Sequence, residues 1–272
     1  MRSNRIDEAL YGKKYSILET GREQRTTVVV PCNLNSSDSN IVDCESNAIL
    51  NFNLYDNVGI VHNEALDFYY SKFGPNYINS RSVDGALGMI NAFLEEKYGF
   101  GMNSDEAKVK LSKILEFATS PSVNIPSLPL VGKVTLNQNC LKALNTVLHD
   151  SSRVSGTHQT RAVIGSILMK ENELALEPMS LSASALVFST LAVARYALQY
   201  RLESPNIKDL PWIPDDSVAR AGWPRWAGAD IVGAYTSFQL SMAGIGGSLG
   251  GPVGFFGTMA AVGATTSYIS TL

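Results

Sequence analysis

Apolar side chains recur at helical spacing along the chain from about residue 55 onward. The first such pattern follows Tyr55, with Asp56 as its predicted N-cap, and Gly74-Pro75 ends it. Its apolar face comprises Val58, Val61, Ala65, Tyr69 and Phe73. Positions three and four apart lie on one side of an α-helix, so the segment is predicted to be a helix with this face inward.

The same period predicts five more helices before residue 204. They cover residues 82–98, 103–118, 136–148, 161–170 and 179–194. The last of them carries no charge over sixteen residues, a length that suits a buried central helix better than a membrane span.

The remaining segments set the predicted domain boundaries. Residues 1–52 lack helical periodicity and are predicted to be poorly structured, apart from a strand at the β-branched run Thr26–Val30. Residues 53–203 form the helical bundle, interrupted by a proline-rich loop near residues 120–133. A Pro- and Trp-rich connector at 204–228 then leads to a distinct C-terminal segment at 229–272.

The C-terminal segment has unusual physical properties. From Ile231 to Leu272 there are 42 residues without Asp, Glu, Lys, Arg or His. Glycines recur there at a spacing of four, which lets two helices approach closely: Gly246, Gly250 and Gly254 form one row, and Gly247 and Gly251 form a second. Gly250-Gly251-Pro252 is typical of a helix end followed by a new helix start, so the predicted arms are 229–248 and 252–272. The predicted fold class is therefore all-α, a multi-helix bundle with a C-terminal glycine-rich helical hairpin.

Charge and cysteine content argue against a nucleic-acid-binding protein, a zinc protein and a disulfide-rich protein. The net charge is -3, with 22 Lys and Arg scattered among 25 Asp and Glu, so no nucleic-acid partner is expected. The three cysteines (Cys32, Cys44 and Cys140) show no zinc or disulfide-framework spacing, although Cys32 and Cys44 can pair if the protein is exported. No signal peptide is visible, which predicts a cytoplasmic protein, or one that reaches a membrane by a non-classical route.

Motifs for cofactors and nucleophilic catalysis are missing from the sequence. There is no Walker A loop and no GxGxxG after a strand, so no cofactor is predicted. Residues 246–250 match GxSxG, but the histidines at 62, 149 and 158 all precede this serine, unlike the order in α/β-hydrolases. The histidine spacing also predicts no metal site. These absences favour a protein that is not an enzyme.

One polar motif stands out on the first helix. Asn63 and Asp67 are four residues apart and share a face, and His62 lies beside them. One interpretation makes His62 a general base oriented by a carboxylate. The favoured interpretation is structural: the three side chains form hydrogen bonds with neighbouring segments and fix the helix in the bundle.

The chain resembles a family of uncharacterised bacterial proteins common in Bacteroidota. The resemblance rests on the His-Asn-x-x-Leu-Asp helix at 62–67, the small-residue helix that ends in Arg195-Tyr196, the Asp-x-x-Gly-Ala motif at 230–234, and the glycine-rich C-terminus. It covers about residue 53 to the end and implies no activity. The chain departs from the family where Arg201 follows Tyr200, and in lacking the export signal that many relatives carry.

Three classes of function follow from these patterns. The first is a membrane-active glycine-zipper protein, a toxin or bacteriocin-like effector, whose partner is membrane lipid. The second is a soluble helical interaction or structural protein whose hairpin packs internally or mediates self-association. The third is an enzyme that uses His62 and Asp67. The partner of the hairpin and the exposure of His62 distinguish them.

Overall fold

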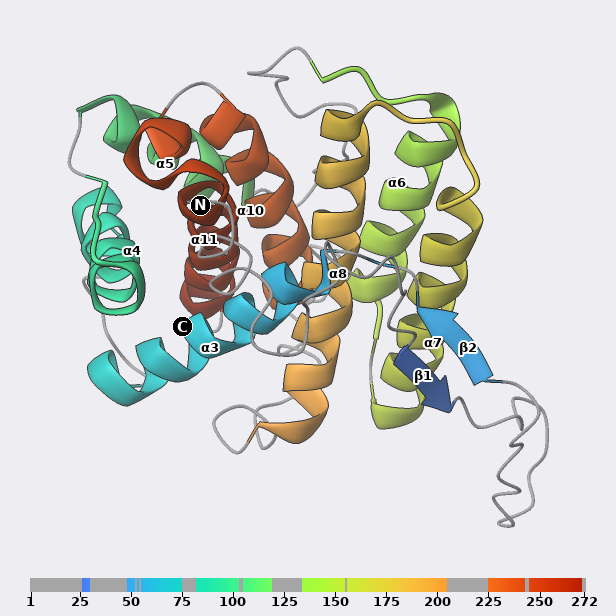
Figure 1. Cartoon of the computed structure of the whole chain (residues 1–272). Coiled ribbons are helices and arrows are strands. Elements are labelled where there is room, and N and C mark those ends of the chain that lie inside the picture. The colour runs from blue at the N-terminus through green and yellow to red at the C-terminus, as the bar shows by residue number, and fades with distance from the viewer. Residues whose placement is uncertain are drawn as a thin grey trace.

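Helices make up nearly all of the structure that a computed structural model of the chain describes (Figure 1). The described residues are 26–29, 48–51, 53, 55–74, 82–102, 105–118, 134–154, 156–204, 225–242 and 245–270. The helices are α3 (Asp56–Phe73), α4 (Val83–Tyr98), α5 (Asp105–Ala118), α6 (Gln138–Ser152), α7 (Thr157–Leu174), α8 (Leu181–Glu203), α10 (Arg225–Met242) and α11 (Ile245–Ser270). The predicted all-α multi-helix fold is confirmed.

Two short strands precede the helices. Strand β1 (Thr26–Val29) pairs antiparallel with β2 (Ala48–Asn51), so that Thr26 lies opposite Asn51. β1 coincides with the β-branched run noted in the sequence, whereas β2 was not predicted. The rest of the predicted N-terminal segment, the loop at 120–133 and most of the connector at 204–228 lie outside the described residues.

Local sequence explains where the helices begin and end. The hydroxyl of Ser82 accepts a hydrogen bond from the Gly85 N–H at 3.0 Å, and Gly99 ends α4 in the left-handed conformation, as predicted. The prediction for α3 was wrong by one residue, because Tyr55 occupies the N-cap position. Asp56 lies in the first turn, where its carboxylate accepts a hydrogen bond from Arg195 instead of capping the helix.

The break between the two C-terminal helices is not at Gly250-Gly251-Pro252. α10 ends at Met242, and α11 begins at Ile245 and continues through all three residues. Proline inside a helix removes one hydrogen bond but does not always end the helix.

α10 and α11, called here the C-terminal helix pair, lie antiparallel. Near one end the Thr266 hydroxyl donates to the Ala229 carbonyl at 2.9 Å, and further along Ser237 donates to the Met259 carbonyl at 3.3 Å. Five helices pack around this pair: α3, α4, α5, α6 and α8. In Figure 1 the pair (red) lies between α4 and α8, and α3 (blue) also packs against it.

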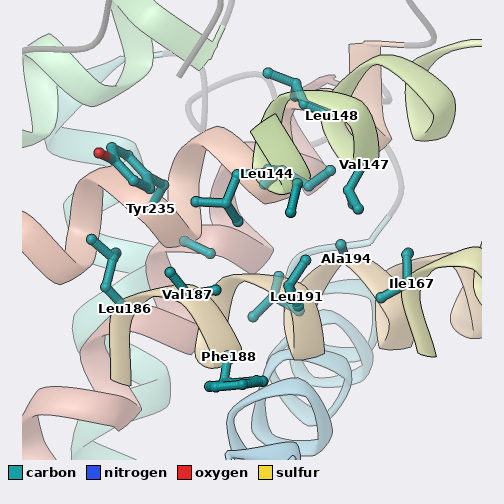
Figure 2. Close-up of a cluster of buried hydrophobic side chains, with 14 of the residues drawn as sticks. Leu144, Val147, Leu148, Ile167, Leu186, Val187, Phe188, Leu191, Ala194 and Tyr235 are labelled. Atoms are coloured by element: carbon teal, nitrogen blue, oxygen red, sulfur yellow. The ribbon is translucent and has the colours of Figure 1, made fainter. Parts of the chain in front are cut away.

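The C-terminal helix pair contributes to two clusters of buried apolar side chains. One cluster lies among α6, α7, α8 and α10, and Figure 2 shows leucines of α6 and α8 converging there with Tyr235 of α10. The other joins α3, α4 and α5 to the second half of α11, through Ala261, Val262, Ala264 and Tyr268. The helix pair therefore connects the two halves of the core.

Among the described residues, one helix, α8, is long and apolar enough to cross a membrane. Most of its apolar stretch is buried by other parts of the protein, and it carries the buried Arg195 and Arg201. This arrangement agrees with the buried central helix predicted for residues 179–194.

Candidate functional site

His62 meets a carboxylate from the far end of the chain. It lies on α3, and its Nε2 is 2.9 Å from Oδ1 of Asp230 on α10. The side chains are 0% and 1% exposed, respectively. Gly263 of α11 lies against the ring, because a Cβ built there would be 3.3 Å from His62 Cδ2. The contact thus joins α3 to both helices of the C-terminal pair.

The second ring nitrogen of His62 is also occupied. Its Nδ1 is 3.0 Å from Oδ1 of Asn63. The amide nitrogen of Asn63 donates in turn to the Tyr196 carbonyl of α8 at 3.0 Å. The amide orientation follows from this second bond, because a carbonyl oxygen can accept only from the N–H side. Asn63 therefore presents an acceptor to the histidine.

Asp67 does not join His62, although the two are close in sequence. Its side chain lies at the surface, and its Oδ1 accepts a hydrogen bond from the Tyr200 hydroxyl of α8 at 2.8 Å. The carboxylate that contacts His62 is Asp230 instead. The three motif residues therefore contact two different helices: His62 contacts α10, while Asn63 and Asp67 contact α8.

Burial dominates the electrostatics of Asp230. Removal from water raises the pKa of this carboxyl, while the charge and hydrogen bond of His62, together with a hydrogen bond from Ser267, lower it in part. A carboxyl in this position holds a proton more readily than one in water.

A second buried polar network, which the sequence patterns did not predict, lies beside the first. Arg195 of α8 donates to Asp56 of α3, and its Nε is 3.3 Å from Glu171 Oε2 on α7. Asn53 donates to Glu171 Oε1 at 2.6 Å and to the Phe188 carbonyl at 2.8 Å. The one sequence signal was an arginine directly after a long uncharged run, since such a residue in a core helix needs acidic partners.

This network contains two carboxylates for one guanidinium. Burial raises the pKa of Glu171 to about 7, and the nearby charge of Asp56 adds to the effect, whereas Arg195 and Asn53 oppose it. Glu171 therefore changes its charge near neutral pH.

Tyrosines supply further hydrogen bonds between α3 and α11. The Tyr69 hydroxyl donates to the Ala261 carbonyl at 3.2 Å and accepts from Thr265 at 3.1 Å. The hydroxyl of Tyr268 donates to the Gly74 carbonyl just after α3. Since Tyr69 lies two turns after His62, α3 presents one polar row to the C-terminal helix pair.

The predicted glycine rows and the observed close contact are at different positions. Gly246, Gly247, Gly250 and Gly251 belong to α11, but their surroundings lie outside the described residues; Gly254 is buried. The close approach of α10 and α11 is at Gly233, where a Cβ would overlap with the Thr266 side chain and lie 3.1 Å from Gly263 Cα.

The geometry limits the chemistry of this site. A substrate cannot reach His62 or Asp230 while both are buried. Among the described residues no group of three His, Cys, Asp or Glu side chains is placed to hold a metal ion. What the arrangement can do is share a proton between an imidazole and a carboxyl, and hold three helices together.

Comparison with known proteins adds no identity to this picture. No protein family, curated protein or solved structure matches the chain.

Proposed function

We propose that this protein is membrane-active, a toxin or bacteriocin-like effector that stores its C-terminal helix pair inside a soluble helical body and releases it into lipid. The observation that carries the proposal is the burial of an uncharged segment. Every described residue of 231–238 and 254–268 is buried, except the half-buried Phe255 and Phe256. No charge occurs from residue 231 to 272.

The absence of charge from residue 231 onward lowers the free-energy cost of moving this segment into lipid. Each Asp, Lys or Arg at the bilayer centre costs about 2.5–3.5 kcal/mol, and residues 231–272 carry none of them; Arg225 and Asp230 lie at the start of α10. α11 has 26 residues, which is above the length needed to cross the hydrocarbon core, whereas α10 has 18 residues with Arg225 and Asp230 among its first six.

Hydroxyl groups in the helix pair are compatible with lipid. Thr236 donates to the Val232 carbonyl at 2.6 Å, and the Thr265 hydroxyl, which donates to Tyr69 in the folded protein, also lies 2.8 Å from the Ala261 carbonyl, to which it can donate once Tyr69 has moved away. Because these acceptors belong to the same helix as the donor, the two threonine hydroxyls have a partner when the helices leave the soluble body. Self-association of several inserted pairs around a polar lumen fits the remaining polarity.

Vesicles test the proposal directly. The full-length protein should float with liposomes and release an enclosed dye under at least one pH or proteolytic trigger, with anionic and neutral lipids compared. Hydrogen exchange on the bound protein should keep residues 254–268 protected while α5 loses protection, because only the helix pair enters lipid.

A matched pair of charge variants sharpens the test. Phe256→Lys places a charge within α11 at a half-buried position, where the long side chain can still reach water in the soluble body. It should reduce dye release at least tenfold. Leu176→Lys, at a position 89% exposed after α7, should change nothing. Circular dichroism checks that both variants are folded.

The second candidate is a soluble interaction or structural protein, and a specific observation favours it. The helix pair supplies side chains to both apolar clusters, which is what a permanent core element does. A protein that neither floats with liposomes nor releases dye under any trigger supports this candidate. The resemblance to the uncharacterised bacterial family stays a prediction and assigns neither function.

A further inference from the structure

Both ring nitrogens of His62 face hydrogen-bond acceptors. Nδ1 faces the Asn63 oxygen at 3.0 Å, and Nε2 faces the Asp230 carboxyl at 2.9 Å. A neutral imidazole carries only one N–H, so it cannot donate to two ionised or carbonyl oxygens at once. One more proton is needed at this site than a neutral histidine and an ionised aspartate supply.

Two arrangements satisfy the geometry. In the first, an imidazolium donates to both Asn63 and the Asp230 carboxylate. In the second, a neutral imidazole donates from Nδ1 to Asn63, while a protonated Asp230 donates to Nε2. The two differ only in where the shared proton lies, and both hold the same number of protons. Burial of Asp230, which raises its pKa, favours retention of that proton.

We propose that the His62–Asp230 contact binds one shared proton and that this proton holds α10 against α3, so that the contact weakens as pH rises. Without it, the one remaining ring hydrogen can serve the Asp230 carboxylate or the Asn63 oxygen but not both, so one of the two contacts at this buried site is left without a donor, and the attraction between imidazolium and carboxylate is lost. The proposal does not depend on membrane activity, so it can be tested on the protein in water.

Other ionisable groups near the pair do not replace this proton. Several of those on α3, α8 and α11 have another described partner: Glu64 with Lys97, Asp67 with Tyr200, Arg195 with Asp56 and Glu171, Tyr69 with Thr265, and Tyr268 with the Gly74 carbonyl. In α10, Arg225 and Tyr235 are the other ionisable residues. The charge that acts on Asp230 is that of His62.

The sign of the pH effect follows from proton counting. An unfolded histidine releases its proton near pH 6.5, and an unfolded aspartate has already done so near pH 3.9. Above about pH 6.5 the folded protein therefore holds one proton more than the unfolded chain. The unfolding equilibrium constant should rise about tenfold per pH unit, until the folded pair releases its proton.

Asp230→Asn is the matched variant. Its amide N–H can donate to Nε2 of a neutral imidazole, so the hydrogen bonds are kept and no extra proton is needed. Denaturant unfolding of both full-length proteins from pH 7 to 9.5 gives the ratio of their unfolding constants. The ratio of the wild-type constant to the variant constant should rise about tenfold per pH unit. Parallel curves would overturn the proposal.

Nitrogen NMR of the wild-type protein gives a reading that does not require the variant to fold. The His62 ring should keep its proton on Nδ1 at pH 8, through either arrangement. A neutral ring protonated at Nε2, or a ring that loses a proton with a midpoint near pH 6.5, overturns the proposal.

Discussion

At the scale of single residues, neighbours on α3 serve different partners. His62 is buried against α10, whereas Asp67 lies at the surface and binds Tyr200 of α8. Two side chains of the same sequence motif therefore differ in burial and in hydrogen-bond partner, so their removal should cost different amounts of stability.

Substitution should separate the two residues. His62→Ala leaves the Asp230 carboxyl buried without its partner and should lower the free energy of unfolding by about 3–5 kcal/mol. Asp67→Ala removes one partly exposed hydrogen bond and should cost about 1 kcal/mol. Urea denaturation of both variants measures the difference; equal losses would contradict the structural account.

Glu171 should give the protein a distinct pH dependence. Its pKa is raised from 4.5 to about 7 in the folded protein, so between these values the folded state binds more protons than the unfolded state. Its contribution to stability is therefore greatest below pH 4.5 and falls by roughly 3 kcal/mol as pH rises to 7. Glu171→Gln, compared with the wild type over this range, should lack that fall.

Sequence patterns found the motif residues but not their partners. His62, Asn63 and Asp67 were recognised by their spacing on one helix. Asp230 is 168 positions away, and hydrophobic periodicity reports which face of a helix is buried, not which helix covers it. The Arg195–Glu171 network was missed for the same reason, since its members come from separate helices.

At the scale of elements, small residues decide where helices touch. α3 approaches α8 at Gly59, where a Cβ would overlap with the Tyr196 ring and lie 2.8 Å from the Ala192 carbonyl. α10 approaches α11 at Gly233 in the same way. The predicted packing at Gly246, Gly247, Gly250 and Gly251 stays a prediction, because their surroundings lie outside the described residues; Gly233 was not singled out, because a sequence shows repetition but not a single contact.

Two alanine variants test this close packing. Gly233→Ala should destabilise the protein by about 1–3 kcal/mol, because the Thr266 side chain and α11 must shift. Gly88→Ala is the control: this exposed glycine in the middle of α4 has open space around it, and alanine there should stabilise by about 0.5–1 kcal/mol. If the melting temperature shifts in the same direction for both variants, the result would argue against close packing at Gly233.

Some helix boundaries were predicted correctly from the sequence, and others were not. Ser82 and Gly99 set the limits of α4 as the sequence indicates. Gly250-Gly251-Pro252 did not end α11, because a stop signal is a local preference that tertiary packing can outweigh.

At the scale of the whole molecule, the C-terminal helix pair belongs to both apolar clusters. A chain truncated after residue 226 should therefore lose fixed tertiary structure throughout and not fold as a smaller bundle. Near-ultraviolet circular dichroism and limited proteolysis provide the readout. A truncated protein with a cooperative melt would contradict this expectation, and it would favour ready release of the pair.

The distance in sequence between His62 and Asp230 also bears on how the protein is made. Translation proceeds at about 5–20 residues per second, so the 168 residues between the partners take roughly 10 to 30 seconds to synthesise. During that interval the inner face of α3 has no C-terminal helix to cover it. The nascent chain thus exposes an apolar surface until α10 and α11 have been synthesised, and we expect chaperones that bind at the ribosome to cover this surface during that interval.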